Sequence, residues 1–230
     1  MNWSVISGDI ISSTSFNENG RILIEDSIKE LLKDIKEIFN VYGRVIKGDY
    51  LECVVPEPIH SLRVALAIKC FVKSIPISET LHYKLNKRIK LFKIYGIRLA
   101  IGYGELKRFN PDKEIIDGEA IYLSGRTINE LTTYNKERIV IKNTLFFVSK
   151  VEKLNNQFEA LFEMLDLIIS KATPRQCRVL YLKLMNKNED AIATKLNIAQ
   201  SAVNQHSTSA GWNAIEKAVN YFKDTINNYK

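Results

Sequence analysis

Two aspartates near the start of the chain have the residue type and the setting to bind a cation. Asp9 lies in "VISGDIISST", where the surrounding apolar residues indicate a buried strand over residues 4–11. A carboxylate buried there costs several kcal/mol unless it is paired, hydrogen-bonded or bound to a metal. Asp49 follows Gly48 in "RVIKGDYLECVV", a pattern typical of two strands joined by a tight turn. Two carboxylates with a backbone carbonyl suit Mg²⁺, which also takes phosphate oxygens.

The elements that must position these aspartates alternate in type over the first 145 residues. The predicted strands cover 4–11, two segments within 44–55, 97–106 and 137–142, and the predicted helices cover 21–42, 59–75 and 118–134. Gly43 is the expected stop of the first helix, and residues 73–95 are expected to be irregular. This order favours an α+β fold, a ferredoxin-like α/β sandwich whose first strand lies beside the hairpin. We therefore expect Asp9 and Asp49 to converge.

Each of these positions also has a purely structural explanation. Asp9 at a strand end is suited to accept a hydrogen bond from a neighbouring backbone N–H, and Asp49 is suited to a plain turn. Gly102 and Gly104 in "IGYGEL" either permit a close backbone approach or kink the strand. These alternatives stay open at the level of sequence.

The second half of the chain has helical periodicity throughout. The change in composition near residue 150 predicts a boundary between a domain over residues 1–150 and a helical domain over residues 151–230. Apolar residues at helical spacing over 158–169 form one stripe. This stripe either packs within its own domain or forms the seam of a dimer.

The most informative segment of the second half is "NEDAIATKLNIAQSAVNQHSTSAGWNAI". Ile192 anchors a short helix, and Asn197 stands where a turn requires positive φ, which Asn tolerates. Gln200 begins the next helix, which Val203 anchors inward. Upstream, Thr173 is suited to cap a helix that starts at the following proline. The segment predicts three helices, the last two joined by a tight turn.

This arrangement resembles the helix-turn-helix of response-regulator and sigma-factor-like DNA-binding domains, whose second helix lies in the major groove. The resemblance implies base contacts from outward-facing polar side chains, namely Gln200, Ser201, Asn204, Gln205 and Thr208. It implies phosphate contacts from nearby cations, namely Arg175, Arg178, Lys187 and Lys195. The alternative is a helical bundle used only for packing or dimerisation.

The order of short motifs in the first half resembles the nucleotide-cyclase fold of class III cyclases and GGDEF proteins. The motifs are "GDI" followed by "ST", then "GD" on the predicted hairpin, "IRLAIGYGEL" and "GEAIYLSGRTINEL". With the helix-turn-helix pattern added, the whole chain is similar to the SatD-like family. The resemblance implies a cyclase-like domain followed by a DNA-binding one.

The cyclase resemblance implies roles for three residues. Asp9 and Asp49 match the metal aspartates, which would hold Mg²⁺ with the phosphates of a ligand, and Arg126 matches the arginine that stabilises charge on the transferring phosphate. The family's asparagine four residues before that arginine is Tyr122 here. The base-selecting lysine has no clear equivalent, since Lys47 precedes Asp49 by two residues rather than four. These departures favour nucleotide or phosphate binding over catalysis, and the alternative for Arg126 is an ion pair or a solvated side chain.

Composition sets the class of protein and its partners. The formal net charge is +7 and the pI about 9.2, which favours anionic partners such as nucleic acid. The chain has no apolar run of membrane-spanning length and no signal-like start, so we expect a cytoplasmic protein with no membrane partner. The three cysteines lie far apart in apolar segments, which indicates buried reduced thiols.

The sequence favours one function and keeps two alternatives. The favoured function is a DNA-binding transcriptional regulator, a homodimer whose cyclase-like domain senses a nucleotide or phosphate ligand or dimerises without catalysis. The first alternative is a divergent metal-dependent nucleotidyl cyclase whose helical tail only tethers or dimerises it. The second is a protein-interaction scaffold on an inactive cyclase-like fold.

Overall fold

The computed structural model describes residues 2–46, 48–83, 88–130 and 141–229. Within these ranges the strands are β1 (Asn2–Ile10), β2 (Tyr42–Ile46), β3 (Tyr50–Val55), β4 (Ile97–Asn110), β5 (Ile115–Gly118) and β6 (Leu145–Ser149). The helices are α1 (Glu18–Phe39), α2 (Ser61–Ser74), α3 (Ile89–Tyr95), α4 (Glu119–Glu130), α5 (Glu152–Lys171), α6 (Pro174–Leu184), α7 (Glu189–Leu196), α8 (Gln200–Ser209) and α9 (Trp212–Asn227). Among the described residues, none of the helices has both the length and the apolar character needed to cross a membrane.

The sheet places β1 at its centre. β1 pairs antiparallel with β3 on one side and with β4 on the other, and β2 pairs antiparallel with β3. β6 pairs parallel with β4, while β5 folds back on the far end of β4. The predicted α+β class and the neighbouring positions of the first strand and the β2–β3 hairpin are therefore confirmed.

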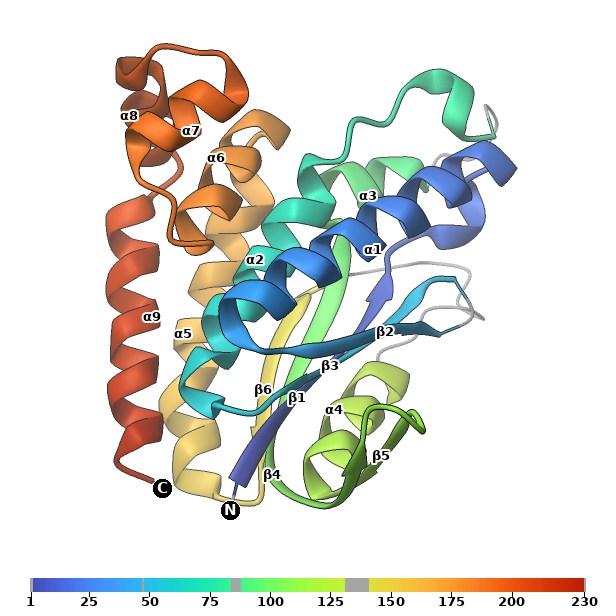
Figure 1. Cartoon of the computed structure of the whole chain (residues 1–230), viewed down its shortest axis with the longest axis vertical. Helices are drawn as coiled ribbons and strands as arrows, with labels where there is room; N and C mark the ends of the chain where they lie inside the picture. The colour runs from blue at the N-terminus through green and yellow to red at the C-terminus, as the bar shows by residue number, and fades with distance from the viewer. Residues whose placement is uncertain (1, 47, 84–87, 131–140, 230) are drawn as a thin grey trace.

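Helices cover both faces of this sheet (Figure 1). α1 and α2 lie on one face, and α4 lies on the other, beside the β4–β5 hairpin. Because strand side chains alternate, Ile6 of β1 enters the larger core on the α1 and α2 side, while Val5 packs with Ala120 of α4. Burial on both faces explains why β1 reads as a nearly continuous apolar segment.

The largest differences from the predicted helices are at α1 and α3. α1 starts three residues earlier, because the Asn17 side chain accepts a hydrogen bond from the Gly20 N–H, and it ends before Asn40, which has φ 53°. The prediction that Gly43 stops this helix is wrong, since Gly43 lies within β2. The segment expected to be irregular contains α3, which buries Ile89 and Phe92 one turn apart. The helical spacing of Ile89 and Phe92 extends over only seven residues, which is too short to stand out in a lysine-rich segment.

The last strand of the sheet was not predicted from sequence. The predicted strand over 137–142 falls largely outside the described residues, and residues 141 and 142 are not in a strand. β6 instead covers 145–149, where Leu145 is buried and pairs with Leu99 of β4. Five apolar-rich residues next to a long helical segment carry too little periodicity to be separated from it.

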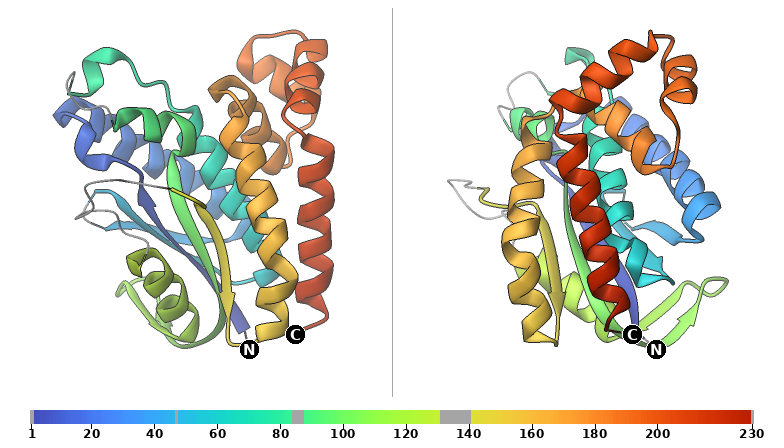
Figure 2. Two further views of the ribbon diagram at one scale, coloured as in Figure 1. Left: turned by 180° about the vertical axis from the view of Figure 1, so that it is seen from behind. Right: turned by 90° about the vertical axis from the view of Figure 1, so that its left-hand side faces the viewer.

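α5 to α8 follow the predicted order, and α9 is a fourth helix after α5 where three were predicted. α5, α6 and α9 pack against the sheet domain. Thr173 caps α6 with a reciprocal capping box, and Asn197 takes φ 52° between α7 and α8. One hydrophobic core runs across residue 150, joining the sheet to α5, α6 and α9 (Figure 2). The apolar stripe of α5 faces inward, with Phe158, Phe162 and Ile169 fully or almost fully buried. This confirms packing within the chain for these residues, and the domain boundary at residue 150 stays a prediction.

Candidate functional site

The end of β1 and the tip of the β2–β3 hairpin form the floor of the site. Asp9 pairs in register with Tyr50 at the start of β3. The Ile10 N–H donates to the Asp49 carbonyl over 3.0 Å, which holds the hairpin tip against the end of β1. Gly48, with φ 81°, makes the turn that brings Asp49 to this position.

Asp9, Asp49 and Arg126 line one cavity of about 780 Å³. They come from β1, the hairpin and α4, three elements that are far apart in sequence. The remaining lining residues are Ile10, Ile11, Ser12, Ser13, Thr14, Ile46, Tyr50, Glu52, Arg88, Leu91, Ile121, Tyr122, Gly125, Asn129 and Ile141. The cavity thus combines carboxylates, hydroxyls, two arginines and an apolar wall.

Arg98 is the charged partner of Asp9, and sequence reasoning missed it. Arg98 Nη1 lies 3.4 Å from each carboxylate oxygen of Asp9, and the two residues face each other across β4 and β1. The Arg98 side chain is 5% exposed and that of Asp9 is 26% exposed. Burial raises the pKa of Asp9, the Arg98 charge lowers it, and the Asp49 carboxylate raises it again. The only sequence signal was a buried arginine in a strand, and its register with Asp9 depends on strand pairing.

Asp49 is held by a short segment that follows β1. Ser13 Oγ donates to Asp49 Oδ2 over 2.8 Å. Ser12 has φ 59°, and residues Ser13–Ser15 form a single 3-10 turn. The reversal at Ser12 therefore brings Ser13 and Thr14 to the wall of the cavity.

The carboxylates fit a Mg²⁺ ion that is completed by a ligand. Glu52 also lines the cavity, but its Oε2 accepts from Arg44 Nε over 2.9 Å and from Arg44 Nη2 over 2.6 Å, a closer pairing than the 3.4 Å contacts of Asp9 with Arg98. Among the described residues, no group of three or more His, Cys, Asp or Glu side chains could hold a metal. Two carboxylates are the usual protein share of a Mg²⁺ site that takes its other oxygens from water and phosphate.

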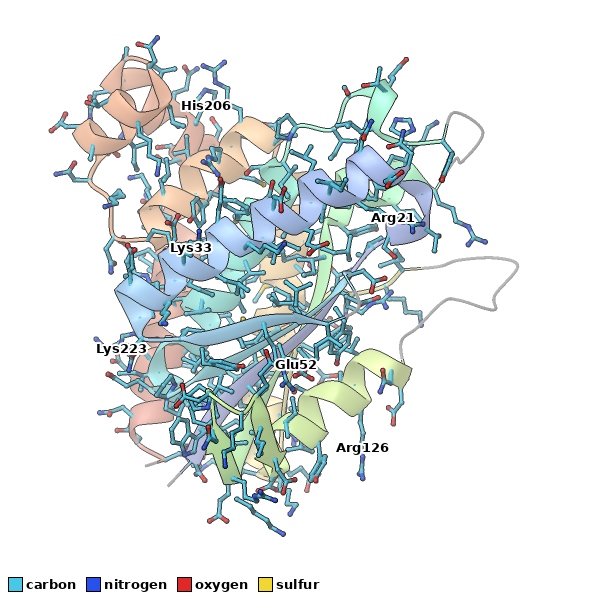
Figure 3. All side chains as sticks on the ribbon, turned by 45° about the vertical axis from the view of Figure 1, so that its right-hand side comes forward. Arg21, Lys33, Glu52, Arg126, His206 and Lys223 are labelled. Carbon is cyan, nitrogen blue, oxygen red and sulfur yellow. The ribbon has the colours of Figure 1, made fainter. Side chains whose placement is uncertain are left out.

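Gly102 of β4 sets how closely α4 approaches the sheet. A Cβ on Gly102 would lie 2.1 Å from the Ala120 carbonyl oxygen, so this glycine permits close approach rather than serving only to kink the strand. Ser7 and Ser124 share a 2.8 Å hydrogen bond that also fastens α4 to β1. Arg126, an exposed residue of α4, stands at the rim of the cavity, with its tip directed to solvent in Figure 3.

A second, smaller cavity of about 250 Å³ adjoins the first. Both cavities are lined by Ile10, Ser13, Thr14 and Asp49, and the smaller one adds Arg21 at the start of α1. Asp49 therefore lines two adjoining cavities, the larger with Arg88 and Arg126 and the smaller with Arg21.

The residues predicted to contact DNA bases share one exposed face of α8. Gln200, Ser201, Asn204, Gln205 and Thr208 are all exposed, while Val203 and Ser207 are buried. This face lies at the opposite end of the molecule from the cavity between the hairpin and α4 (Figure 1). His206, labelled in Figure 3, is half-buried.

The cations predicted to contact phosphate are placed differently from one another. Arg175, Lys187 and Lys195 are exposed. The guanidinium of Arg178 instead lies over the rings of Phe71 and Tyr181, 5.1 and 5.4 Å from their centroids. Arg178 therefore contributes to the contact between α6 and α2, a packing role that its sequence position did not indicate.

Comparisons with protein-family models and with curated proteins find no match, so similarity to the SatD-like family stays a prediction. Among solved structures, the chain is similar to a bacterial light-regulated adenylyl cyclase, with 15% identity and a TM-score of 0.43 over 68% of this chain and 80% of that one. It is also similar to the guanylyl cyclase Cya2, with 12% identity and a TM-score of 0.38 over 57% of this chain and 71% of that one.

Proposed function

We propose that the cavity lined by Asp9, Asp49 and Arg126 binds a nucleoside triphosphate together with Mg²⁺. The observation that carries this proposal is that the three residues, drawn from separate elements, line a single cavity of about 780 Å³. A volume of this size suits a nucleotide. The predicted motif order of a cyclase-like domain supports the same assignment.

The side chains divide into three roles. Asp9 and Asp49 would hold the cation, which would neutralise phosphate charge when bound. Arg126 at the rim would contact a phosphate with its planar guanidinium. Thr14, which lines both cavities, would donate its hydroxyl to a phosphate oxygen, while Ser13 donates to Asp49 and keeps that carboxylate in place.

The reaction that this arrangement would support is cyclisation of the nucleotide. The 3′-hydroxyl oxygen attacks the α-phosphorus and forms an ester bond, and the bond from the α-phosphorus to the bridging oxygen of the β-phosphate breaks. Pyrophosphate leaves with the bridging oxygen, and the hydroxyl proton passes to solvent. Arg126 would stabilise the charge on the α-phosphate oxygens as the new bond forms.

The test is pyrophosphate release from each of the four common nucleoside triphosphates with Mg²⁺ or Mn²⁺. We expect Asp9→Asn and Asp49→Asn each to lower the rate at least about a hundredfold. Glu130→Gln is the matched control, because Glu130 is an exposed acidic residue of α4 that does not line the cavity. Calorimetric titration with the same nucleotides measures binding separately. No binding and no release with any triphosphate would overturn the proposal.

We further propose that α8 binds DNA, as the second candidate function. It is supported by the common exposure of its five polar side chains and by the tight turn at Asn197. The charge of this part of the chain is modest, since residues 151–230 contain ten Lys and Arg against eight Asp and Glu. Phosphate contacts would therefore depend on a few cations, above all Arg175 and Lys195.

Fluorescence anisotropy with random duplex DNA at several salt concentrations tests this second function. We expect binding that weakens steeply with salt, and Arg175→Ala should reduce the salt dependence by about one phosphate contact. Lys223→Ala is the control, since Lys223 is exposed on α9, away from α8 (Figure 3). Absence of binding at low salt would assign α6 to α8 a packing role only.

A further inference from the structure

Tyr122 is an exposed aromatic residue on the wall of the candidate nucleotide cavity. It lies on α4, lines the cavity and is 54% exposed. A large ring left this open to solvent loses the burial that would normally favour it in a fold. Its place on a cavity wall indicates a surface on which a flat group of a ligand can pack.

The Tyr122 side chain is also tethered at its tip. Its hydroxyl donates to Asp117 Oδ1, and this hydrogen bond raises the pKa of the phenol. Asp117 belongs to β5 and pairs in register with Arg108 of β4. A tyrosine whose tip is tethered to a strand loses less rotational freedom when a ligand binds, so stacking on it costs less.

The surroundings leave room for a flat group beside the ring. Gly125 follows Tyr122 by three residues, on the same side of α4, and also lines the cavity. A Cβ built on Gly125 would meet only the Tyr50 hydroxyl, at 3.7 Å. The space between Tyr122 and Tyr50 is therefore not filled by a side chain at position 125. Ile121 and Ile46 add apolar surface to the cavity lining.

Tyr122 lines the same cavity as the two carboxylates and lies next to Arg126 on α4. Arg126 follows Tyr122 by four residues, one helical turn, so the two side chains are neighbours on the α4 surface. Phosphates held between Asp9, Asp49 and Arg126 would leave the rest of the ligand to extend along α4. Tyr122 is the aromatic residue among those of α4 that line the cavity.

We propose that the Tyr122 ring is the stacking platform for the aromatic base of the bound nucleotide. This inference rests on the proposed nucleotide-binding function and adds how the base is held. Stacking on a ring face is tolerant of base identity, because every base presents a π-face. The site should therefore bind purine nucleotides with little discrimination and prefer any of them to a bare polyphosphate.

The test is calorimetric titration of the full chain, with Mg²⁺, against ATP, GTP and inorganic tripolyphosphate. We expect Tyr122→Ala to weaken ATP and GTP about five- to hundredfold and to leave tripolyphosphate within about twofold. Tyr122→Phe keeps the ring and loses the Asp117 hydrogen bond, so it should retain most of the affinity. Tyr83→Ala is the matched control, since Tyr83 is 55% exposed and does not line the cavity.

The outcomes separate this inference from the function on which it rests. If tripolyphosphate binds but Tyr122→Ala leaves nucleotide affinity unchanged, the stacking role is wrong and the phosphate site stands. If ATP and tripolyphosphate bind the unmodified chain equally well, the stacking role is also wrong. If neither nucleotides nor tripolyphosphate bind, the proposed function fails and the stacking role fails with it.

Discussion

The guanidinium of Arg98 lies 3.4 Å from both carboxylate oxygens of Asp9, directly across the central strand pair β1 and β4. This contact explains how a carboxylate is accommodated at the end of a buried strand. The two charges are neighbours because strand register places them side by side, and a buried pair costs far less than a buried single charge. The Asp9 side chain is still partly exposed, at the floor of the cavity.

The first prediction concerns the pH dependence of stability. Burial raises the pKa of Asp9 above 3.8 despite Arg98, so the folded chain binds this proton more tightly than the unfolded chain does. The resulting stabilisation is complete below about pH 3.8 and is lost as the pH rises through the raised pKa. Asp9→Asn stays neutral and lacks this component. The free energy of unfolding of the unmodified chain should therefore fall relative to the variant as the pH rises from about 4 to 7.

Urea unfolding followed by circular dichroism at a series of pH values measures this difference. A difference that does not change with pH, or that grows with rising pH, would contradict the assigned direction of the Asp9 pKa.

The second prediction concerns the buried ion pair of Lys69 and Asp166. Lys69 is fully buried on α2, and its Nζ lies 3.0 Å from Asp166 Oδ1 and 3.1 Å from the Ile97 carbonyl oxygen. Lys69→Met should destabilise the chain by about 3–5 kcal/mol, because it leaves a buried carboxylate without its cation. Adding Asp166→Asn should recover much of this loss, since the asparagine carbonyl can still accept from the Thr144 N–H.

Chemical denaturation of the single and double variants gives the coupling energy of this pair. Lys171→Met, at an exposed lysine on the same helix as Asp166, should stay within about 0.5 kcal/mol of the unmodified chain. A double-variant effect equal to the sum of the Lys69→Met and Asp166→Asn effects would show that the pair is not coupled.

The third prediction concerns the packing of α4 against β4. Gly102→Ala should destabilise the chain by about 1–3 kcal/mol, because its Cβ would lie 2.1 Å from the Ala120 carbonyl oxygen and push α4 off the sheet. Gly125 lies in α4 itself, and a Cβ built there meets nothing nearer than 3.7 Å. Gly125→Ala should therefore be neutral or stabilising by about 0.5–1 kcal/mol. Thermal denaturation of both variants compares them directly, and equal midpoints would show that the approach at Gly102 is not tight.

The fourth prediction concerns the boundary at residue 150. A chain of residues 1–150 lacks Asp166, the partner of Lys69, and lacks the Ile169 and Ser170 carbonyls to which Lys73 donates over 2.7 and 2.6 Å. It also exposes the core around Phe147, which packs on Phe158 and Phe222. We expect this fragment not to unfold cooperatively, whereas the full chain does. A cooperative transition in the fragment would establish residues 1–150 as an independent domain.

Local features of the fold could be read from the sequence because their causes are local. The turn at Gly48, the cap at Thr173 and the positive φ at Asn197 each follow from the chemistry of one residue and its neighbours. Periodicity alone predicted α1 and α5, whose apolar residues repeat over many turns. Short elements such as β6 and α3 offer too few residues for a pattern, and they were missed.

The meeting of Asp9 and Asp49 was predicted because strand order follows from the order of elements. The sequence determined the two carboxylates, the hairpin between β2 and β3, and the helices that close the two faces of the sheet. Only the tertiary structure decided that Arg98 pairs with Asp9, that Arg178 lies over aromatic rings, and that Tyr122 stands on the cavity wall. These contacts join residues from separate elements, and their distances depend on strand register and helix packing, which no local pattern of residues specifies.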